Sequence, residues 1–308
     1  GGVPFYKIRT IGGTPDAYIS KELFDDYKTK YNYPHKGEVM ITCAGTVGKC
    51  VIYDGKDAYY QDSNIVWIDN PSQYIGNGFL YHLLANVDWR KLNSTTIIRI
   101  YNDDLRNLKL SYPQIEEQKK ISRLLSLLDD RISTQNKIIE KLESLIKGIR
   151  NDVFGKLRKS VGFNAMIGDV LSYEQPQSYL VEDTEYTNEG TPVLTANKAF
   201  VLGYTSEIEG IYDKGDCIIF DDFTLDCKYV DFSFKVKSSA IKILTAKNKE
   251  LLRYTFEFLK YLDLSTEEHK RHYITETQNQ EFILPTVQII RTISHAFYAL
   301  SLWKETIV

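Results

Sequence analysis

Two short loops carry the side chains best suited to contact a nucleic acid. The first, Gly45-Thr46-Val47-Gly48-Lys49, lies between two strand-like runs. Its glycines permit close approach of the backbone, Thr46 can donate a hydrogen bond to a base edge, and Lys49 can neutralise a phosphate. The alternative is a plain hairpin turn, because glycine marks turns in many folds.

The second loop is Asp221-Asp222-Phe223-Thr224, which Lys228 follows. A carboxylate can accept a hydrogen bond from cytosine N4, and threonine can pair with several bases. The same residues would equally form a solvated acidic turn. A third candidate is the basic trio Lys270-Arg271-His272, which could meet DNA at a loop tip or form a solvated helix end.

The complete candidate set for DNA contacts joins these loops to residues that follow the Gly-x-Pro segments at Gly2 and Gly190. Its members are Lys7, Arg9, Thr42, Gly45, Thr46, Lys49, Thr195, Asn197, Lys198, Asp222, Thr224, Lys228 and Arg271. Cationic members would bind phosphates, and polar members would face base edges. Some of the weaker candidates are expected to be ordinary surface residues.

Residues with catalytic or metal-binding spacing are absent from the sequence. Asn70-Pro71-Ser72-Gln73 matches only half of the Asn-Pro-Pro-Tyr motif of adenine methyltransferases, and no Gly-rich methyl-donor loop accompanies it. There is no G-x-x-x-x-G-K-[ST] phosphate loop, and the four cysteines form no C-x-x-C pair. The histidines lack the H-E-x-x-H order. We therefore expect no catalytic residues, no metal, no cofactor and no enzymatic activity.

A long periodic stretch, residues 115–154, must position these loops. Residues at alternating spacings of three and four are Ile121, Leu125, Leu128, Ile132, Gln135, Ile139, Leu142, Ile146, Ile149 and Val153. This pattern is typical of a coiled-coil seam, in which a polar residue such as Gln135 can set the register. Such a helix would be about 58 Å long, which exceeds the diameter of a small domain. The alternative is an ordinary amphipathic core helix, with Gln135 half exposed.

A second copy of the seam is expected near the C-terminus. Shifted by 172 residues, Ile121 aligns with Ile293, and the seam continues through Phe297 and Leu300. Two helices in one phase, each closing one half of the chain, predict an intramolecular antiparallel pair. The second helix is the shorter one, so the pair cannot match over the full length of the first.

Length and composition favour two globular domains. The chain has 308 residues, of which 43% are hydrophobic and 13% aromatic, enough to bury sizeable cores. A net charge of −3 argues against a protein that coats DNA freely, although it permits local basic patches. Without a long apolar run or a signal peptide, we expect a cytoplasmic protein with no membrane partner and with reduced, buried cysteines.

The two halves of the chain repeat one order of segments. Lys214-Gly215-Asp216-Cys217 matches Lys36-Gly37-Glu38-Val39, and Ser239-Ala240-Ile241 matches Ser63-Asn64-Ile65. In each half the sequence predicts short strands followed by one helix. This helix is expected at about 76–92 in the first half and at about 249–263 in the second. The expected fold class is α+β, with two duplicated α/β domains separated by a long helix. A second, C-terminal helix pairs with the first as an antiparallel coiled coil. The expected boundaries are 1–114, 115–155, 156–286 and 287–308.

This arrangement resembles the specificity subunit of type I restriction–modification systems over nearly the whole chain. The matching residues are Pro113-Gln114-Ile115-Glu116-Glu117-Gln118-Lys119-Lys120-Ile121, the loop at 45–49, Ser63-Asn64-Ile65, and the segments 220–224 and 228–232. The chain departs from the family pattern twice. The first domain lacks the leading segment that residues 166–171 provide in the second, and the second helix has Gln288-Ile289-Ile290 instead of Glu-Gln. We interpret the sequence as truncated at both ends.

The resemblance implies two target-recognition domains, at 1–114 and 156–286, each reading half of a bipartite site in double-stranded DNA. It also implies that the helices set the gap between half-sites and dock methyltransferase (modification) subunits, through which a restriction subunit joins. Catalysis would belong to those partners. The expected spacer and docking residues are Gln118, Ile121, Leu125, Leu128, Ile132, Gln135, Ile139, Leu142, Ile146, Ile149, Ile293, Phe297 and Leu300. The alternative, favoured by the slightly acidic charge, is a coiled-coil scaffold that presents two domains to protein partners.

Overall fold

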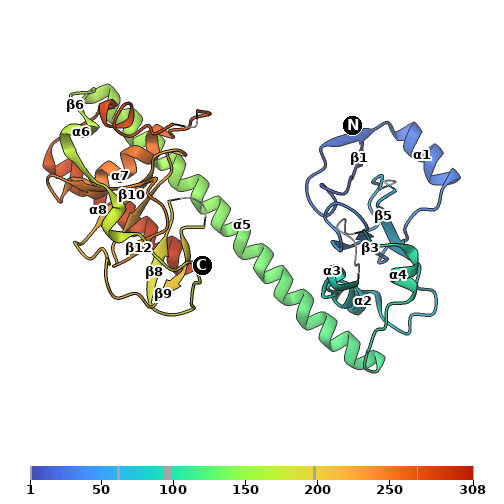
Figure 1. Ribbon diagram of the computed structural model, residues 1–308. Coiled ribbons are helices and arrows are strands. Elements are labelled where there is room, and N and C mark those ends of the chain that lie inside the picture. Colours follow the sequence, from blue (N-terminus) through green and yellow to red (C-terminus); the bar gives the residue numbers. More distant parts are fainter. Residues whose placement is uncertain (1, 61–62, 93–98, 197–198, 269, 308) are drawn as a thin grey trace. The chain divides into compact units, whose positions relative to one another are not determined.

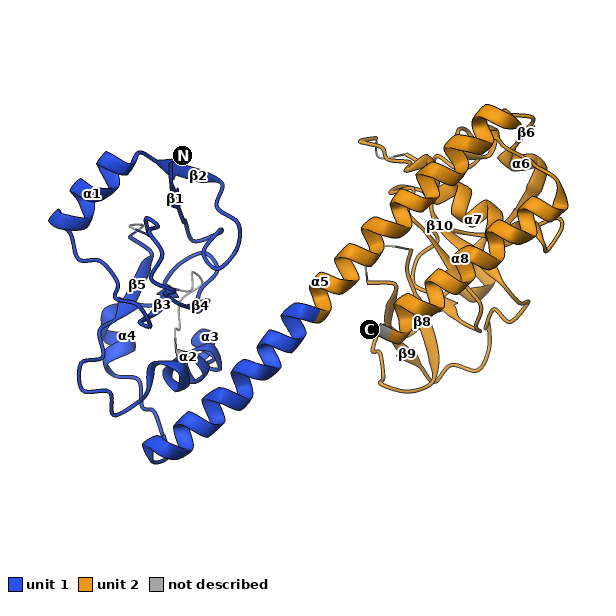
Figure 2. Ribbon diagram, turned by 180° about the vertical axis from the view of Figure 1, so that it is seen from behind, with its two compact units in different colours: residues 1–134 blue, residues 135–308 orange. Residues whose placement is uncertain are grey.

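A computed structural model describes residues 2–60, 63–92, 99–196, 199–268 and 270–307 (Figure 1). The chain folds into two compact units, residues 1–134 and 135–308 (Figure 2). The helix α5, Ile115–Ser160, contributes residues to both units. It begins where the sequence predicts and continues five residues beyond the predicted end at residue 155.

Unit 1 contains short strands and short helices in addition to the first turns of α5. The strands are β1 Val3–Phe5, β2 Ala17–Ile19, β3 Val39–Thr42, β4 Cys50–Ile52 and β5 Ile65–Ile68. The helices are α1 Lys21–Lys30, α2 Asn77–Ala85, α3 Trp89–Leu92 and α4 Asn102–Arg106.

The central strand of unit 1 is β3, which pairs antiparallel with β4 and β5. Successive side chains on a strand point to opposite faces. Val39 and Ile41 accordingly join one core with Leu80 of α2, while Met40 joins another core with Ile11. Both faces of β3 are covered, which explains why its sequence is a continuous apolar run rather than an alternating one.

Unit 2 is larger. Its strands are β6 Ala165–Met166, β7 Leu171–Glu174, β8 Thr191–Leu194, β9 Val201–Thr205, β10 Cys217–Asp221, β11 Cys227–Val230, β12 Lys235–Val236, β13 Ile241–Ala246 and β14 Glu281–Phe282. Its helices, besides α5, are α6 Ile167–Val170, η1 Pro176–Tyr179, α7 Leu251–Leu262, η2 Thr277–Asn279 and α8 Val287–Ile307.

The predicted duplication is visible in the two main sheets. The order β4-β3-β5 in unit 1 corresponds to β11-β10-β13 in unit 2, and a helix follows each set, α2 or α7. Even a loop contact repeats: the Ile100 N–H donates to the Cys43 carbonyl (2.9 Å), and the His272 N–H donates to the Asp222 carbonyl (3.1 Å). In unit 2 the additional strand β7 pairs with β13, whereas the described part of unit 1 pairs β5 with β3 alone.

The predicted antiparallel helix pair is confirmed within unit 2, where α8 lies beside the second half of α5 (Figure 2). Lys304 pairs with Glu143 at 2.5 Å, and the Arg150 guanidinium lies 5.5 Å from the ring centre of Phe297. Residue numbers therefore rise on one helix as they fall on the other. The seam residues in this core include Ile146, Ile149, Val153, Ile293, Phe297 and Leu300.

The local elements differ from the sequence prediction in two places. The helix predicted at 76–92 is interrupted, because α2 ends at Ala85 and α3 begins at Trp89. Helix α1 was not predicted: it has one buried residue, Phe24, so no apolar stripe marks it. A hydrogen bond from the Leu23 N–H to the Ser20 hydroxyl (3.2 Å) caps its first turn.

The side chain of Gln118 fastens α5 to the rest of unit 1. It is 1% exposed, and its Oε1 accepts a hydrogen bond from the Gly76 N–H at 2.9 Å. Its Nε2 donates to the carbonyls of Tyr74 (3.0 Å) and Pro113 (2.9 Å). Gly76 is the N-cap of α2 and has no side chain of its own to cap that helix. Gln118 therefore satisfies one free donor of α2 and two loop carbonyls at once.

We predict that Gln118→Leu destabilises unit 1 by about 1–3 kcal/mol or more, because a buried N–H and two carbonyls lose their partner. Urea unfolding of the full chain, followed by circular dichroism, would measure the loss. Gln114→Leu is the matched control, since Gln114 lies on the same segment with an exposed side chain. Equal stability of the two variants would contradict this role for Gln118.

Candidate nucleic-acid interface

The loop between β3 and β4 is held in shape by Thr42. The Thr42 hydroxyl accepts a hydrogen bond from the Lys49 N–H (3.0 Å) and donates to the Thr46 carbonyl. Gly45 and Gly48 have φ angles of +68° and +83°, and a Cβ at Gly48 would clash with the Trp89 ring. This position therefore requires glycine. Thr42 itself is fully buried, so it shapes the loop instead of facing solvent.

A turn at residues 7–13 lies against this loop. A Cβ built at Gly12 would lie 3.6 Å from Cε of Lys49, and one built at Gly45 would lie 3.4 Å from Cγ2 of Ile8. Lys7 and Arg9, at the start of the turn, both reach Asp16, at 3.5 and 2.7 Å. The Arg9 hydrogen bond lowers the pKa of the Asp16 carboxyl. The Arg9 side chain remains 84% exposed.

Residues 87–90 complete the surface. A hollow of about 450 Å³ lies between residues 87–90 and the loop residues Gly45, Thr46 and Val47. Arg90 lines the hollow and is exposed, and its N–H donates to Asp88 at 3.2 Å. The sequence prediction placed Arg90 inside a helix and did not include it among the candidate DNA contacts. The basic run Trp89-Arg90-Lys91 is the signal that could have identified it.

In unit 1 the structure thus brings together Lys7, Arg9, Thr46, Lys49 and Arg90. We call this set the unit 1 loop surface. It carries four cations, and the neighbouring carboxylates are Asp16 and Asp88. Cationic side chains around an exposed threonine and a glycine-rich loop can bind phosphates while the loop approaches base edges.

The equivalent connection in unit 2 is the β10–β11 hairpin. Asp221, at the end of β10, accepts hydrogen bonds from the N–H groups of Phe223 and Thr224, both at 2.9 Å. Leu225 closes the turn with a φ of +63°. Thr224 is exposed at the tip of this hairpin. Its hydroxyl accepts a hydrogen bond from the Asp226 N–H at 3.4 Å.

Asp222 is buried and ties the hairpin to the loop that follows α7. It is 1% exposed, and its Oδ1 accepts from the N–H groups of His272 (3.0 Å) and Tyr273 (2.7 Å). Its Oδ2 lies 3.0 Å from Nζ of Lys242, which is fully buried and also donates to Gln175 at 3.0 Å. In this position the carboxylate does not reach a base edge. It holds two loops together instead.

This tie brings Arg271 to the same side as the hairpin. Arg271 is exposed, whereas its neighbour Lys270 pairs with Glu268 (2.6 Å) and Glu276 (2.9 Å). His272 is buried, and its hydrogen bond to Glu276 raises the pKa of the imidazole. Thr224 and Arg271 form what we call the unit 2 loop surface, the counterpart of the unit 1 loop surface.

The remaining candidates lie elsewhere. Thr195 is 8% exposed, and its N–H donates to the Phe200 carbonyl at 2.8 Å. Lys228 is half-buried on β11 beside Lys260 and Lys304, away from the hairpin tip. Asn197 and Lys198 lie outside the described residues. The structure therefore does not bring the whole predicted set to one surface in unit 2.

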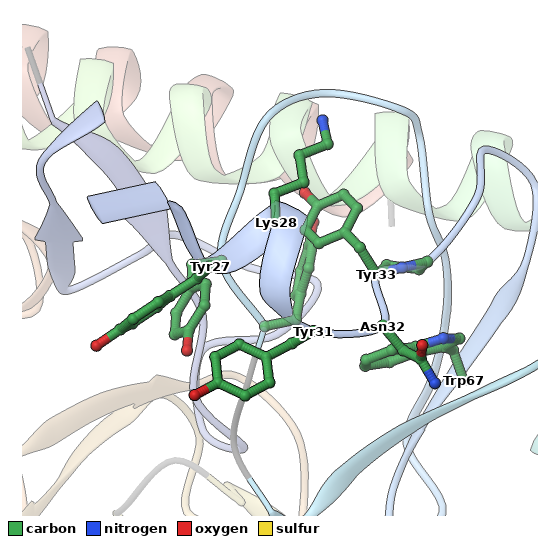
Figure 3. A pocket seen from close by; sticks show the side chains of 9 residues that line it. Tyr27, Lys28, Tyr31, Asn32, Tyr33 and Trp67 are labelled. Carbon is green, nitrogen blue, oxygen red and sulfur yellow. The ribbon is translucent and has the colours of Figure 1, made fainter. Parts of the chain in front are cut away.

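An aromatic hollow at the end of α1 is too small to receive a base. Figure 3 shows its lining, in which Tyr27, Tyr31, Tyr33 and Trp67 surround a space of about 10 Å³. This volume is about that of one water molecule's probe sphere. The Tyr33 hydroxyl donates to the Ala58 carbonyl at 2.5 Å, and Tyr33 and Trp67 pack against the core that contains Met40.

The described residues contain no group of three or more His, Cys, Asp and Glu placed to hold a metal ion. The cysteines at 43, 50, 217 and 227 are free and buried, as the sequence predicts. Burial raises the pKa of the Cys50 and Cys217 thiols to about 12, which makes both unreactive. Within the described part of the chain, no helix is long and apolar enough to span a membrane.

Comparison with known proteins finds a family match for the first part of the chain. Residues 1–144 match the family described as "Type I restriction modification DNA specificity domain". A putative type I restriction enzyme specificity subunit of Haemophilus influenzae is 48% identical over 147 residues, 48% of this chain and 37% of the relative. The EcoR124I/EcoR124II specificity subunit of Escherichia coli is 45% identical over 126 residues, 39% of this chain and 31% of the relative.

The fold extends the likeness to the whole chain. The crystal structure of a type I restriction–modification system S subunit from M. genitalium has a TM-score of 0.64 and 15% identity, covering 100% of this chain and 84% of that one. At such low identity this likeness concerns the fold alone. Residues 1–144 belong to the type I specificity-domain family, and the predicted resemblance of the chain to a type I specificity subunit is confirmed. The chain spans 37% and 31% of the length of the two curated relatives.

We predict that Asp222→Ala destabilises unit 2 by about 3–5 kcal/mol, because it leaves the Lys242 ammonium buried without a counter-charge. Urea unfolding of the full chain would show the loss. Asp226→Ala, on the exposed side of the same hairpin, should change stability little. Adding Lys242→Met to Asp222→Ala should restore part of the stability, and a double variant no more stable than the single one would contradict the ion-pair explanation.

Proposed function

We propose that the chain recognises DNA sequence within a type I restriction–modification complex. The main support is that the specificity-domain segment, residues 1–144, forms a cationic loop surface around Thr46. Lys7, Arg9, Lys49 and Arg90 would hold phosphates of double-stranded DNA, while Thr46 and its loop face base edges. The chain would perform no catalysis.

The duplication supports recognition of a bipartite DNA site. Both units place a short loop at the end of the same central strand, but the chemistry of the two loops differs. Unit 1 presents Thr46 and Lys49 there, and unit 2 presents Thr224 with Arg271. Domains at 1–114 and 156–286 would each read one half-site, with helical segments 115–155 and 287–308 setting the spacing.

An exposed apolar stripe on α5 supports docking of methyltransferase subunits. Leu124, Leu127, Leu128 and Ile132 are 59%, 57%, 48% and 59% exposed. Gln118, which lies on the face of α5 opposite Leu127, and Ser126 contact the rest of unit 1. Exposed apolar residues in a row mark an interaction site. A restriction subunit would join through the methyltransferase, and action on chromosomal DNA implies a cytoplasmic location.

The same stripe supports a second candidate function, a coiled-coil scaffold that presents two domains to protein partners. The net charge of −3 also suits a protein without DNA affinity. The two functions differ in their response to DNA. A scaffold would bind partners through α5 yet show no DNA binding even at low salt, where phosphate contacts are strongest.

We predict that Lys49→Ala weakens DNA binding by the complex with its methyltransferase subunits at every sequence. It should also reduce the slope of log affinity against log salt by about one, because one phosphate contact is lost. Fluorescence anisotropy across a salt series would measure both effects. Thr46→Ala should instead change which sequences are selected from a random library.

Lys30→Ala is the control for these measurements, because Lys30 lies on α1 and pairs with Asp26 at 2.8 Å. If Lys30→Ala and Lys49→Ala have the same effect, the unit 1 loop surface is not the DNA contact. A wild-type complex that fails to bind DNA at low salt would favour the scaffold.

We further predict that Leu127→Glu reduces capture of the methyltransferase subunit encoded beside the chain by at least about tenfold, since it places a charge in a buried apolar contact. Co-purification and titration calorimetry would measure the change. Ser133→Glu adds the same charge on the other side of α5 and should leave capture unchanged. Equal losses in both variants would assign the effect to charge rather than to the stripe.

A further inference from the structure

A cleft of about 350 Å³ opens in unit 2 where α5, α7 and α8 meet. Its charged lining consists of Glu143, Arg150, Arg253, Glu257, Lys260 and Lys304. Phe256 and Phe297 supply apolar walls. None of these residues belongs to the unit 2 loop surface or to the exposed stripe on α5, so the cleft is separate from both.

The floor of the cleft is rigidly built. Glu257 has a side chain only 3% exposed, and its Oε2 accepts two hydrogen bonds from Arg150, at 3.0 Å and 2.7 Å. Arg253 lies 3.4 Å from the other oxygen of Glu257 and donates to Ser301 at 2.8 Å. Both guanidinium groups are therefore fixed before any ligand arrives, which lowers the entropy cost of binding.

The cleft has an excess of positive charge. Its lining has four cations and two carboxylates, a net charge of +2. Lys304 pairs with Glu143, but Lys260 has no ion-pair partner among the described residues. The C-terminal end of α7, close to Lys260, offsets at most about half an elementary charge.

The pKa of Lys228 also reflects this excess of positive charge. Its pKa lies below the ordinary lysine value, first because burial penalises the ammonium and then because Lys260 and Lys304 repel it. Asp226 acts in the opposite direction without cancelling the effect. The ammonium groups of Lys260 and Lys304, which both line the cleft, thus lie near enough to Lys228 to repel it. Such a group of cations is stabilised when an anion binds.

We propose that this cleft binds the phosphate group of a small phosphomonoester. A phosphomonoester carries a charge of about −1.5 to −2 at neutral pH, close to the charge excess of the lining. A phosphodiester of the DNA backbone carries a single charge and matches the cleft less well. The volume lies at the lower end of small-molecule sites, and Phe256 offers a face for the organic part of the ligand.

The test is titration calorimetry of the full chain with AMP at constant ionic strength. Lys260→Met should weaken AMP binding by at least about tenfold, because it removes a charged hydrogen-bond donor from the lining. Lys249→Met, an exposed lysine in the same unit, is the control and should bind as the wild type does. Without ligand, Lys260→Met should be no less stable than the wild type, since it relieves repulsion of Lys228.

Two further probes distinguish the source of the phosphate. Inorganic phosphate should compete with AMP, whereas duplex DNA without terminal phosphates should not. No AMP binding by the wild type, or equal losses in the Lys260 and Lys249 variants, would overturn the site. Displacement of AMP by that DNA would overturn the monoester assignment in favour of a backbone phosphate. None of these results depends on the DNA-recognition loops.

Discussion

Helix α5 is anchored separately in each unit, by different kinds of contact. In unit 1 the anchor is polar, because Gln118 hydrogen-bonds the start of α2 and two loop carbonyls. In unit 2 it is apolar, because Phe154 and Leu157 enter the main core. Between the anchors, Leu128 and Ile132 remain exposed. The helix thus connects two separately packed units while leaving an unpaired surface.

In each unit, a hydrogen-bonded frame carries a loop whose sequence differs between the two units. The frame is the central strand, β3 or β10, whose last residue organises the following turn through its side chain, Thr42 or Asp221. Backbone hydrogen bonds then join that turn to a second loop. Because the side chain that shapes the turn precedes the exposed tip, residues at the tip can change without loss of the frame. This arrangement allows one fold to present two different surfaces.

The sequence predicted the parts of the fold that depend on local periodicity. The heptad spacing identified α5 and α8, and their shared phase predicted the antiparallel contact now seen between Arg150 and Phe297. It could not show that Asp222 is buried, because the partner that makes burial tolerable, Lys242, lies on another strand. Nor could it place Lys228, whose surroundings depend on how α7 and α8 pack. Prediction therefore failed where charge depends on tertiary contact.

The second helix shows why the missing Glu-Gln pair need not weaken its attachment. With the 172-residue offset, Ile290 occupies the position of Gln118, and it is 2% exposed in the main core. Arg291 then reaches Glu250, the N-cap of α7, at 2.6 Å. Hydrogen bonds are directional, so those of Gln118 fix the orientation of α5 relative to α2. Apolar burial is not directional, so the burial of Ile290 does not fix the orientation of α8 in the same way. The direction of α8 is set instead by its packing against α7 and by its seam with α5.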